Sequence, residues 1–238
     1  MSKPRILLLD IETAPNTAYV WGLWDQNIAH DQLKETSYIL CWSAKWLGEK
    51  RIMAADCKDR RNYTKMLRGL AALLDEADIV IHFYGSRFDI PVTNKELIKA
   101  GIPPPSPYKQ VDLKIMVAKV FRFESNKLDH VCEQLGLGKK IKTEFELWIG
   151  CMNNDDNSWY EMVRYNRHDV VLLEKLYYRL LPWIGNHPNL SVYTGTLCCP
   201  KCGSTNIQKR GVQVAVLKTY TRFHCQKCGG WFRGNEAD

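Results

Sequence analysis

Two acidic residues follow the first apolar run of the chain. Residues 6–9 are all apolar, Asp10 and Glu12 come next, and Pro15 follows, which is the pattern of a buried strand that a proline ends. Side chains alternate along a strand, so Asp10 and Glu12 point to the same side, roughly 6.6 Å apart along the backbone. Two carboxylates this close repel each other unless water or a cation lies between them. The pair is therefore either a cation site or a solvated strand end.

Two further acidic residues stand in comparable positions. Asp89 follows a second apolar run, in the stretch HFYGSRFDIP, and Asp169 lies in the longest helical pattern, in the stretch YNRHDVV. Tyr165 precedes Asp169 by four residues, so the two share one face of the helix, about one turn apart. His168 is rotated by roughly 100° from Asp169 and cannot address the same point. An isolated carboxylate on a helix usually forms an ion pair with Lys or Arg. Asp169 is not isolated in this sense, because it belongs to a pattern of acidic residues along the chain.

Four of the nine cysteines form two Cys-x-x-Cys pairs, Cys199 with Cys202 and Cys225 with Cys228. Each pair is followed by glycine, and two such knuckles make a closed tetrahedral Cys₄ zinc site. Four unrelated buried thiols are the alternative. Cys198 could take the place of Cys199 in the first pair, but the stretch Cys-Pro-Lys-Cys-Gly matches the form of a zinc knuckle and favours Cys199. The 22 residues between the knuckles suit a hairpin, so the segment is similar to a zinc ribbon whose ion is structural, because so small a domain buries little apolar area.

The stretches LLLDIET, HFYGSRFDIP and YNRHDVVLLEKLY resemble, in this order, the three motifs of the DEDD family of 3′-to-5′ exonucleases. This family has an RNase H-like fold and includes the proofreading domains of polymerases, and the resemblance covers residues 5 to about 181. The third motif has the form Tyr-x-x-x-Asp of the tyrosine subtype. The histidine subtype would place His five residues before Asp169, where Arg164 stands. His168 is therefore expected to be a surface or packing residue.

The resemblance implies that Asp10, Glu12, Asp89 and Asp169 bind two divalent cations, Mg²⁺ or Mn²⁺. Such hard cations prefer carboxylate oxygens. Two ions about 3.5 to 4 Å apart can generate hydroxide from a bound water and stabilise the leaving 3′ oxygen of a phosphodiester. Tyr165 would orient the attacking water, because a phenol with a pKa near 10 is a poor general base.

Tyr84 departs from the family pattern. The family commonly has Asn at this position of the second motif, so an amide that would contact the substrate or brace the site is absent. Tyr84 is either a core aromatic residue at the strand end or a ring that stacks on a base. Lys139 and Lys140, in the stretch LGLGKK, lack the spacing of a phosphate-binding loop and at most contact the nucleic-acid backbone. The tryptophans at positions 21, 24, 42 and 46 are assigned to the core by default.

The apolar periodicity predicts elements that would position these residues. Residues 37–47 and 50–57 are expected to pair as a hairpin across Gly48. Further strands are predicted at residues 78–85 and 109–113, and helices at residues 62–77, 90–101, 113–121, 127–137 and 158–184. Strands alternating with helices indicate an α/β fold. Together with the resemblance, this predicts an RNase H-like mixed sheet flanked by helices.

Length and charge suggest two parts. With 238 residues and 45% hydrophobic residues, the chain can bury one core and add a smaller appendage. Residues 196–238 carry +5 of the net charge of +7. We expect an exonuclease domain at residues 1–190 and a zinc-ribbon domain at residues 196–238. The sequence has no apolar run long enough to cross a bilayer, and it has no export signal. A soluble cytoplasmic protein is therefore expected.

The basic ribbon segment indicates a polyanionic partner. Its cationic residues are interspersed with rings that could stack on bases or form a small core: Tyr220, Phe223, Trp231 and Phe232. A protein partner of the ribbon is a further alternative. The oligomeric state stays open, and a small nuclease with a ribbon would suit a phage or a bacterium.

The expected function is that of a metal-dependent 3′-to-5′ exonuclease that hydrolyses phosphodiester bonds and releases nucleoside 5′-monophosphates. Its substrate would be a single-stranded 3′ end, with DNA favoured over RNA, and the ribbon would assist binding. The alternative is a catalytically weak or inactive nuclease-fold protein that serves as a nucleic-acid-binding or adaptor module.

Overall fold

The first acidic motif lies on the central strand of a mixed sheet. In a computed structural model, which describes residues 3–236 and the side chains of residues 3–234, β1 (Ile6–Thr13) is the middle strand of five, in the order β5-β4-β1-β6-β7. It pairs antiparallel with β4 (Ile39–Trp46) and parallel with β6 (Ile79–His82). β5 (Ile52–Asp56) and β7 (Lys109–Asp112) form the two edges.

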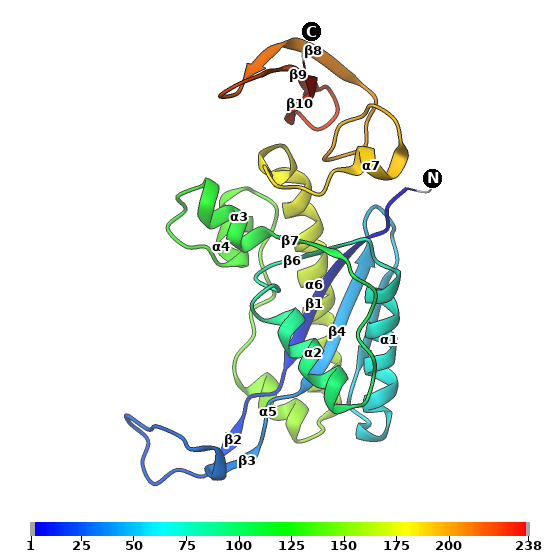
Figure 1. The fold of residues 1–238 in the computed structure, drawn as a ribbon. Helices are drawn as coiled ribbons and strands as arrows, with labels where there is room; N and C mark the ends of the chain where they lie inside the picture. Colours follow the sequence, from blue (N-terminus) through cyan, green and yellow to red (C-terminus); the bar gives the residue numbers. More distant parts are fainter. Residues whose placement is uncertain (1–2, 237–238) are drawn as a thin grey trace.

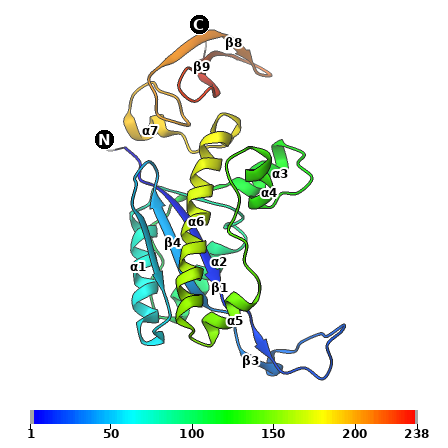
Figure 2. The ribbon, with the colours of Figure 1, turned by 180° about the vertical axis from the view of Figure 1, so that it is seen from behind.

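Alternation along β1 divides the apolar core into two layers. Leu7 packs in a cluster with α1 (Tyr63–Glu76) and α2 (Asp89–Lys99), whereas Leu8 packs in a second cluster with the C-terminal half of α6 (Asp156–Leu180). Figures 1 and 2 show α1 and α6 on opposite sides of the sheet. The predicted mixed sheet flanked by helices is confirmed, because apolar side chains that alternate along a strand need a cover on both faces.

Most of the predicted elements are present with slightly different ends. β4 and β5 form the expected hairpin, and Gly48 in its turn has a φ of +83°. Asn62 occupies the predicted cap position of α1 without a side-chain cap bond. The other helices are η1 (His30–Gln32), η2 (Arg60–Asn62), α3 (Leu113–Val120), α4 (Leu128–Gln134), α5 (Glu146–Met152), η3 (Leu181–Trp183) and α7 (Leu190–Thr194). Among these, α5 is a helix that the sequence did not predict.

An arm of residues 17–35 projects from the end of β1, closed at its base by β2 (Thr17–Ala18) and β3 (Leu33–Glu35) (Figure 1). Trp21 is 99% and Trp24 84% exposed. The prediction that these two tryptophans belong to the core is wrong, because the arm leaves the sheet. The same prediction is confirmed for the tryptophans at positions 42 and 46, which are buried in β4.

The cysteine-rich segment forms a second, three-stranded sheet of β10 (Trp231–Glu236), β9 (Thr219–Cys225) and β8 (Ile207–Val214), at the opposite end of the molecule from the arm (Figures 1 and 2). β8 and β9 are the predicted hairpin, and β10 is an additional strand. The segment is anchored to the end of α6, since Lys201 is buried and its Nζ donates to the carbonyl of Pro182. α7 lies within the stretch predicted as a linker.

Within residues 3–236, no helix has both the length and the apolar character that a membrane span requires.

Candidate functional site

β1 and α6 bring three of the predicted acidic residues together. Asp10 and Glu12 extend from β1, and Asp169 is a 1% exposed residue of α6. One carboxylate oxygen from each of the three lies within 4.8 Å of the others. The side chain of Asn166 donates to Oδ2 of Asp10 (2.7 Å), which fixes that carboxylate against the helix. Residues about 160 positions apart in the sequence therefore form one acidic cluster.

Asp89 lies beside this cluster in a different role. It begins α2 and is 4% exposed, and its Oδ1 accepts a hydrogen bond from the amide of Ile11 (3.1 Å). Ile11 separates Asp10 from Glu12 in the sequence, so this bond ties the second motif to the first. Asp89 is not one of the three carboxylates that gather within 4.8 Å.

Burial and mutual repulsion disfavour ionisation of the acidic cluster. Burial, and then the charges of Asp89 and Asp169, raise the pKa of Asp10 well above its usual range. Burial raises the pKa of Glu12 to about 8 and that of Asp89 to about 7. Oδ1 of Asp169 has no hydrogen-bond partner among the described residues. These observations fit a divalent cation, which would offset the repulsion and complete the coordination of buried carboxylate oxygens.

Lys140 is a member of the site that sequence reasoning missed. Its Nζ lies 2.5 Å from Oδ2 of Asp169 and donates to the hydroxyl oxygen of Tyr165 (2.7 Å). Burial would lower the pKa of Lys140, but Asp169 and Tyr165 raise it above its usual value, so the side chain stays cationic. Lys140 thus makes contacts inside the site that go beyond the nucleic-acid backbone contact expected of it, whereas Lys139 is exposed and pairs with Glu133.

Long-range packing explains why the motif spacing gave no sign of Lys140. Its loop is held by the amide of Lys140, which donates to Oδ1 of Asp129 in α4 (2.7 Å). The one available signal was a pair of lysines between the second and the third acidic stretch. Tyr165 is 7% exposed and shares the α6 face of Asp169. His168 is partly exposed and bonds to the carbonyl of Lys139 (2.8 Å), as expected of a surface or packing residue.

The four paired cysteines converge on one point. Sulfur atoms of Cys199, Cys202, Cys225 and Cys228 lie within 4.8 Å of one another, and two of the distances are 3.7 Å (Cys199 to Cys228) and 3.6 Å (Cys202 to Cys225). Tetrahedral zinc with Zn–S bonds of about 2.3 Å separates its sulfur ligands by roughly 3.8 Å. The cluster therefore has the dimensions of a zinc site.

The knuckle glycines and amides explain this convergence. Gly203 and Gly229 have φ values of +68° and +75°, which glycine adopts without steric cost. Burial tends to raise the pKa of Cys225, but the backbone N–H groups of Cys228 and Lys227 lower it to about 7. Such amides favour the thiolate, the form that binds metal. Cys198 lies outside the cluster, with its sulfur 3.6 Å from the hydroxyl of Thr194.

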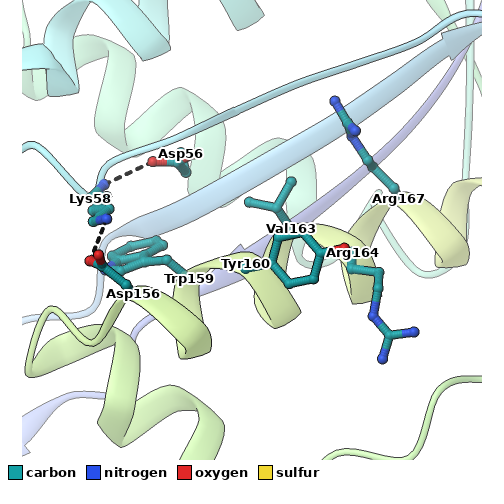
Figure 3. A pocket seen from close by; sticks show the side chains of 8 residues that line it. All are labelled: Asp56, Lys58, Asp156, Trp159, Tyr160, Val163, Arg164 and Arg167. Carbon is teal, nitrogen blue, oxygen red and sulfur yellow. Dashed lines mark hydrogen bonds and ion pairs between the residues drawn. The ribbon is translucent and has the colours of Figure 1, made fainter.

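A hollow of about 440 Å³ on the opposite flank of α6 contains none of the candidate site residues (Figure 3). Arg164 and Arg167 line it, but their side chains point apart, and Arg164 pairs with Glu161. The other lining residues are Asp56, Lys58, Asp156, Trp159, Tyr160 and Val163. The hollow therefore lacks a convergent basic site.

Comparisons with known proteins agree with this fold. The profile of the family RNase_H_2, described as RNase H superfamily, matches residues 7–181. No relative is found among curated proteins. Among solved structures, the chain is similar to the family B DNA polymerase from the hyperthermophilic archaeon Pyrobaculum calidifontis, with a TM-score of 0.58 and 18% identity over 76% of this chain. The match spans 25% of the polymerase chain, so it concerns the fold of one part of that protein.

Proposed function

The chain belongs to the RNase H superfamily, and on this premise we propose that it is a 3′-to-5′ exonuclease of the tyrosine subtype of the DEDD family. The observation that carries the proposal is the cluster of Asp10, Glu12 and Asp169, whose carboxylates lie within 4.8 Å of one another. Asp89 is held beside them by the amide of Ile11. Superfamily membership indicates a phosphodiester-cleaving nuclease, and the three motifs support the 3′-to-5′ direction and nucleoside 5′-monophosphates as products.

Asp10, Glu12, Asp89 and Asp169 would hold two Mg²⁺ or Mn²⁺ ions. When bound, these ions supply a nucleophilic hydroxide and stabilise charge on the leaving oxygen. The residues fit such ions because all four proposed ligands are carboxylates, whose oxygens hard cations prefer. Asn166 orients Asp10 through its hydrogen bond (2.7 Å).

Tyr165 would position the attacking water rather than deprotonate it. Burial and the charges of Asp169 and Glu12 raise the pKa of its hydroxyl above the usual value, so the proton stays on the oxygen. Lys140 donates to that oxygen (2.7 Å), which fixes the position of the hydroxyl. Lys140 also neutralises part of the acidic cluster and offers a cation to the anionic phosphate of a substrate.

We further propose that Cys199, Cys202, Cys225 and Cys228 hold one structural Zn²⁺ in a ribbon domain of residues 196–238, beside a nuclease domain of residues 1–190. Two rings of the ribbon, Phe223 and Phe232, stack on each other as a small core (centroids 5.4 Å apart). Trp231 is 47% exposed, stacks on His224, and has the guanidinium of Arg222 5.3 Å from its ring centroid. This second set of side chains supports contact with nucleic acid.

A cleavage assay separates the enzyme from an inactive nuclease-fold binding module. Single-stranded DNA and RNA labelled at the 5′ end would be incubated with Mg²⁺ or Mn²⁺ and wild-type protein, Asp10→Asn, or the control Asp56→Asn, whose carboxylate lies outside the acidic cluster. We expect progressive shortening from the 3′ end, slowed on the order of 100-fold or more in Asp10→Asn because one ligand charge is lost. If the strands stay equally intact with wild type and with Asp10→Asn, the proposed nuclease activity is refuted.

A further inference from the structure

The turn between β6 and α2 is held by buried side chains on both sides. Oδ1 of Asp112 accepts a hydrogen bond from the amide of Tyr84 (3.0 Å), and its Oδ2 accepts from the amide and the hydroxyl of Ser86 (3.2 and 2.5 Å). The amide of Gly85 donates to Nδ1 of His82 (3.1 Å), which is fully buried. These partners fix the backbone of the turn, and with it the direction of the Tyr84 side chain.

Tyr84 adopts a backbone conformation that aromatic residues avoid. Its φ is +72°, in the left-handed region where a side chain clashes with its own backbone and which Asn and Gly tolerate best. Packing does not explain the presence of tyrosine here, because the residue is 42% exposed. The core alternative for Tyr84 is therefore wrong. Strained residues of this kind concentrate at sites that bind ligands.

A cation lies against the exposed ring. Nζ of Lys114, in the first turn of α3, is 3.7 Å from the ring centroid of Tyr84, within the range of a cation–π contact. Lys114 makes no ion pair among the described residues. This surface thus carries an aromatic ring beside an ammonium group that forms no ion pair within the described part of the chain.

The turn that carries Tyr84 leads directly to Asp89, five residues later at the start of α2. Oδ1 of Asp89 accepts a hydrogen bond from the amide of Ile11, between Asp10 and Glu12, so this turn adjoins the acidic cluster. A strand whose 3′ end reaches the acidic cluster must leave it over the surrounding surface. An unpaired base matches the ring by stacking, and a phosphate matches the ammonium group.

We propose that Tyr84 and Lys114 form a nucleotide subsite for the substrate strand: the ring stacks on an unpaired base upstream of the scissile bond, and Lys114 contacts a neighbouring phosphate. The subsite rests on the proposed function and names two residues that would contact the single-stranded 3′ end expected as its substrate. A base inside a duplex is stacked between its neighbours and offers no free face to the ring, so a strand that is paired at this position binds less well.

The test uses single-stranded DNA oligonucleotides that lack one base at successive positions from the 3′ end. Binding is measured by fluorescence anisotropy with Ca²⁺ in place of Mg²⁺, after a check that the strand stays intact, for wild type, Tyr84→Asn and Lys114→Met. We expect one abasic position to weaken wild-type binding roughly tenfold, the scale of one base–aromatic stack. Tyr84→Asn should bind the intact strand about as weakly and lose sensitivity to that position.

Lys114→Met tests the phosphate contact. It should lower the slope of log affinity against log salt concentration by about 0.7, the value for one phosphate contact on a single strand.

Thermal unfolding distinguishes substrate contact from a structural role, because Asn tolerates the left-handed backbone and Tyr84→Asn should unfold at an equal or higher temperature. A clear drop in its unfolding temperature would overturn the subsite. Wild-type binding with no abasic-sensitive position, or equal sensitivity in Tyr84→Asn, would overturn the subsite alone. Failure of wild type to bind any strand would overturn the proposed function with it.

Discussion

At the scale of single residues, Lys140 shows how a charge balance sets the chemistry of this site. Three carboxylates within 4.8 Å of one another would repel strongly without a cation. Lys140 relieves part of this repulsion by pairing with Asp169, and it also fixes the hydroxyl of Tyr165. The acidic residues could be predicted because their spacing follows three motifs. Lys140 could not, since its place depends on a loop held by Asp129.

Replacing Lys140 with Met should lower the rate of cleavage by about 10 to 100-fold, because Tyr165 and Asp169 lose the side chain that orients them. Binding of the strand should weaken much less than kcat falls. Lys139→Met is the matched control, since Lys139 is exposed and pairs with Glu133 instead of Asp169. Equal rates for the two variants, measured at saturating oligonucleotide and Mg²⁺, would contradict this role of Lys140.

Glu12 contributes to the pH dependence of stability, beside Asp10 and Asp89, whose pKa values are also raised. Its pKa is about 8 in the folded protein, against an ordinary value of 4.5. The folded state therefore holds this proton more tightly, and the resulting stability is complete below pH 4.5 and is lost as the pH rises toward 8. Without divalent cations, the free energy of unfolding should fall by about 2–3 kcal/mol between about pH 6 and about pH 8.5. Urea unfolding measures this, and Glu12→Gln should flatten the decline. A decline of the same size in Glu12→Gln would show that another group causes it.

At the scale of elements, the strands and helices that carry the acidic residues were predictable because their apolar periodicity is strong. β1 carries four consecutive buried residues before Asp10, and α6 buries one continuous face. The arm was not predictable from residue types, since Trp21 and Trp24 are as apolar as the buried tryptophans of β4. Only the path of the chain away from the sheet exposes them.

The turn before α2 depends on the lack of a side chain at Gly85. A Cβ atom there would lie 2.5 Å from Cγ and 2.8 Å from Cβ of His82, which is fully buried and cannot move away. Gly85→Ala should therefore destabilise the protein by about 1–3 kcal/mol and displace Asp89, with loss of cleavage.

Gly101→Ala is the control. A Cβ atom there meets nothing within 4 Å, and only the φ of +67° disfavours alanine, so the loss of stability should be about 1 kcal/mol. Urea unfolding of both variants measures the difference. Equal losses of stability would mean that the contact with His82 is harmless.

At the scale of the whole molecule, α6 connects the acidic cluster to the cysteine cluster. Asp169 and Tyr177 are two turns apart on this helix, about 12 Å. Tyr177 is fully buried, and Cys202 and Cys228 pack against the apolar cluster that contains it. The Cys-x-x-Cys spacing alone predicted that the four cysteines would gather at one point. The docking of the cysteine cluster on α6 could not be predicted, because it depends on contacts such as that of Lys201 with Pro182.

Elemental analysis should find one zinc per chain in protein purified without chelators. Cys225→Ser should lose the metal and unfold at a lower temperature, since the cysteine cluster would no longer cover the end of α6. Cys198→Ser is the matched control and should retain zinc, because Cys198 is buried but lies outside the four-sulfur cluster. Zinc-free wild type, or zinc loss in Cys198→Ser, would contradict the assignment.

The central claim is that acidic residues from distant parts of the chain form one site for hard divalent cations. Anomalous diffraction from crystals soaked in Mn²⁺ tests it most directly. We predict density between Asp10, Glu12 and Asp169, which disappears in Asp169→Asn while the fold is kept. Crystals that are saturated with Mn²⁺ and show no anomalous density at these carboxylates would contradict the claim.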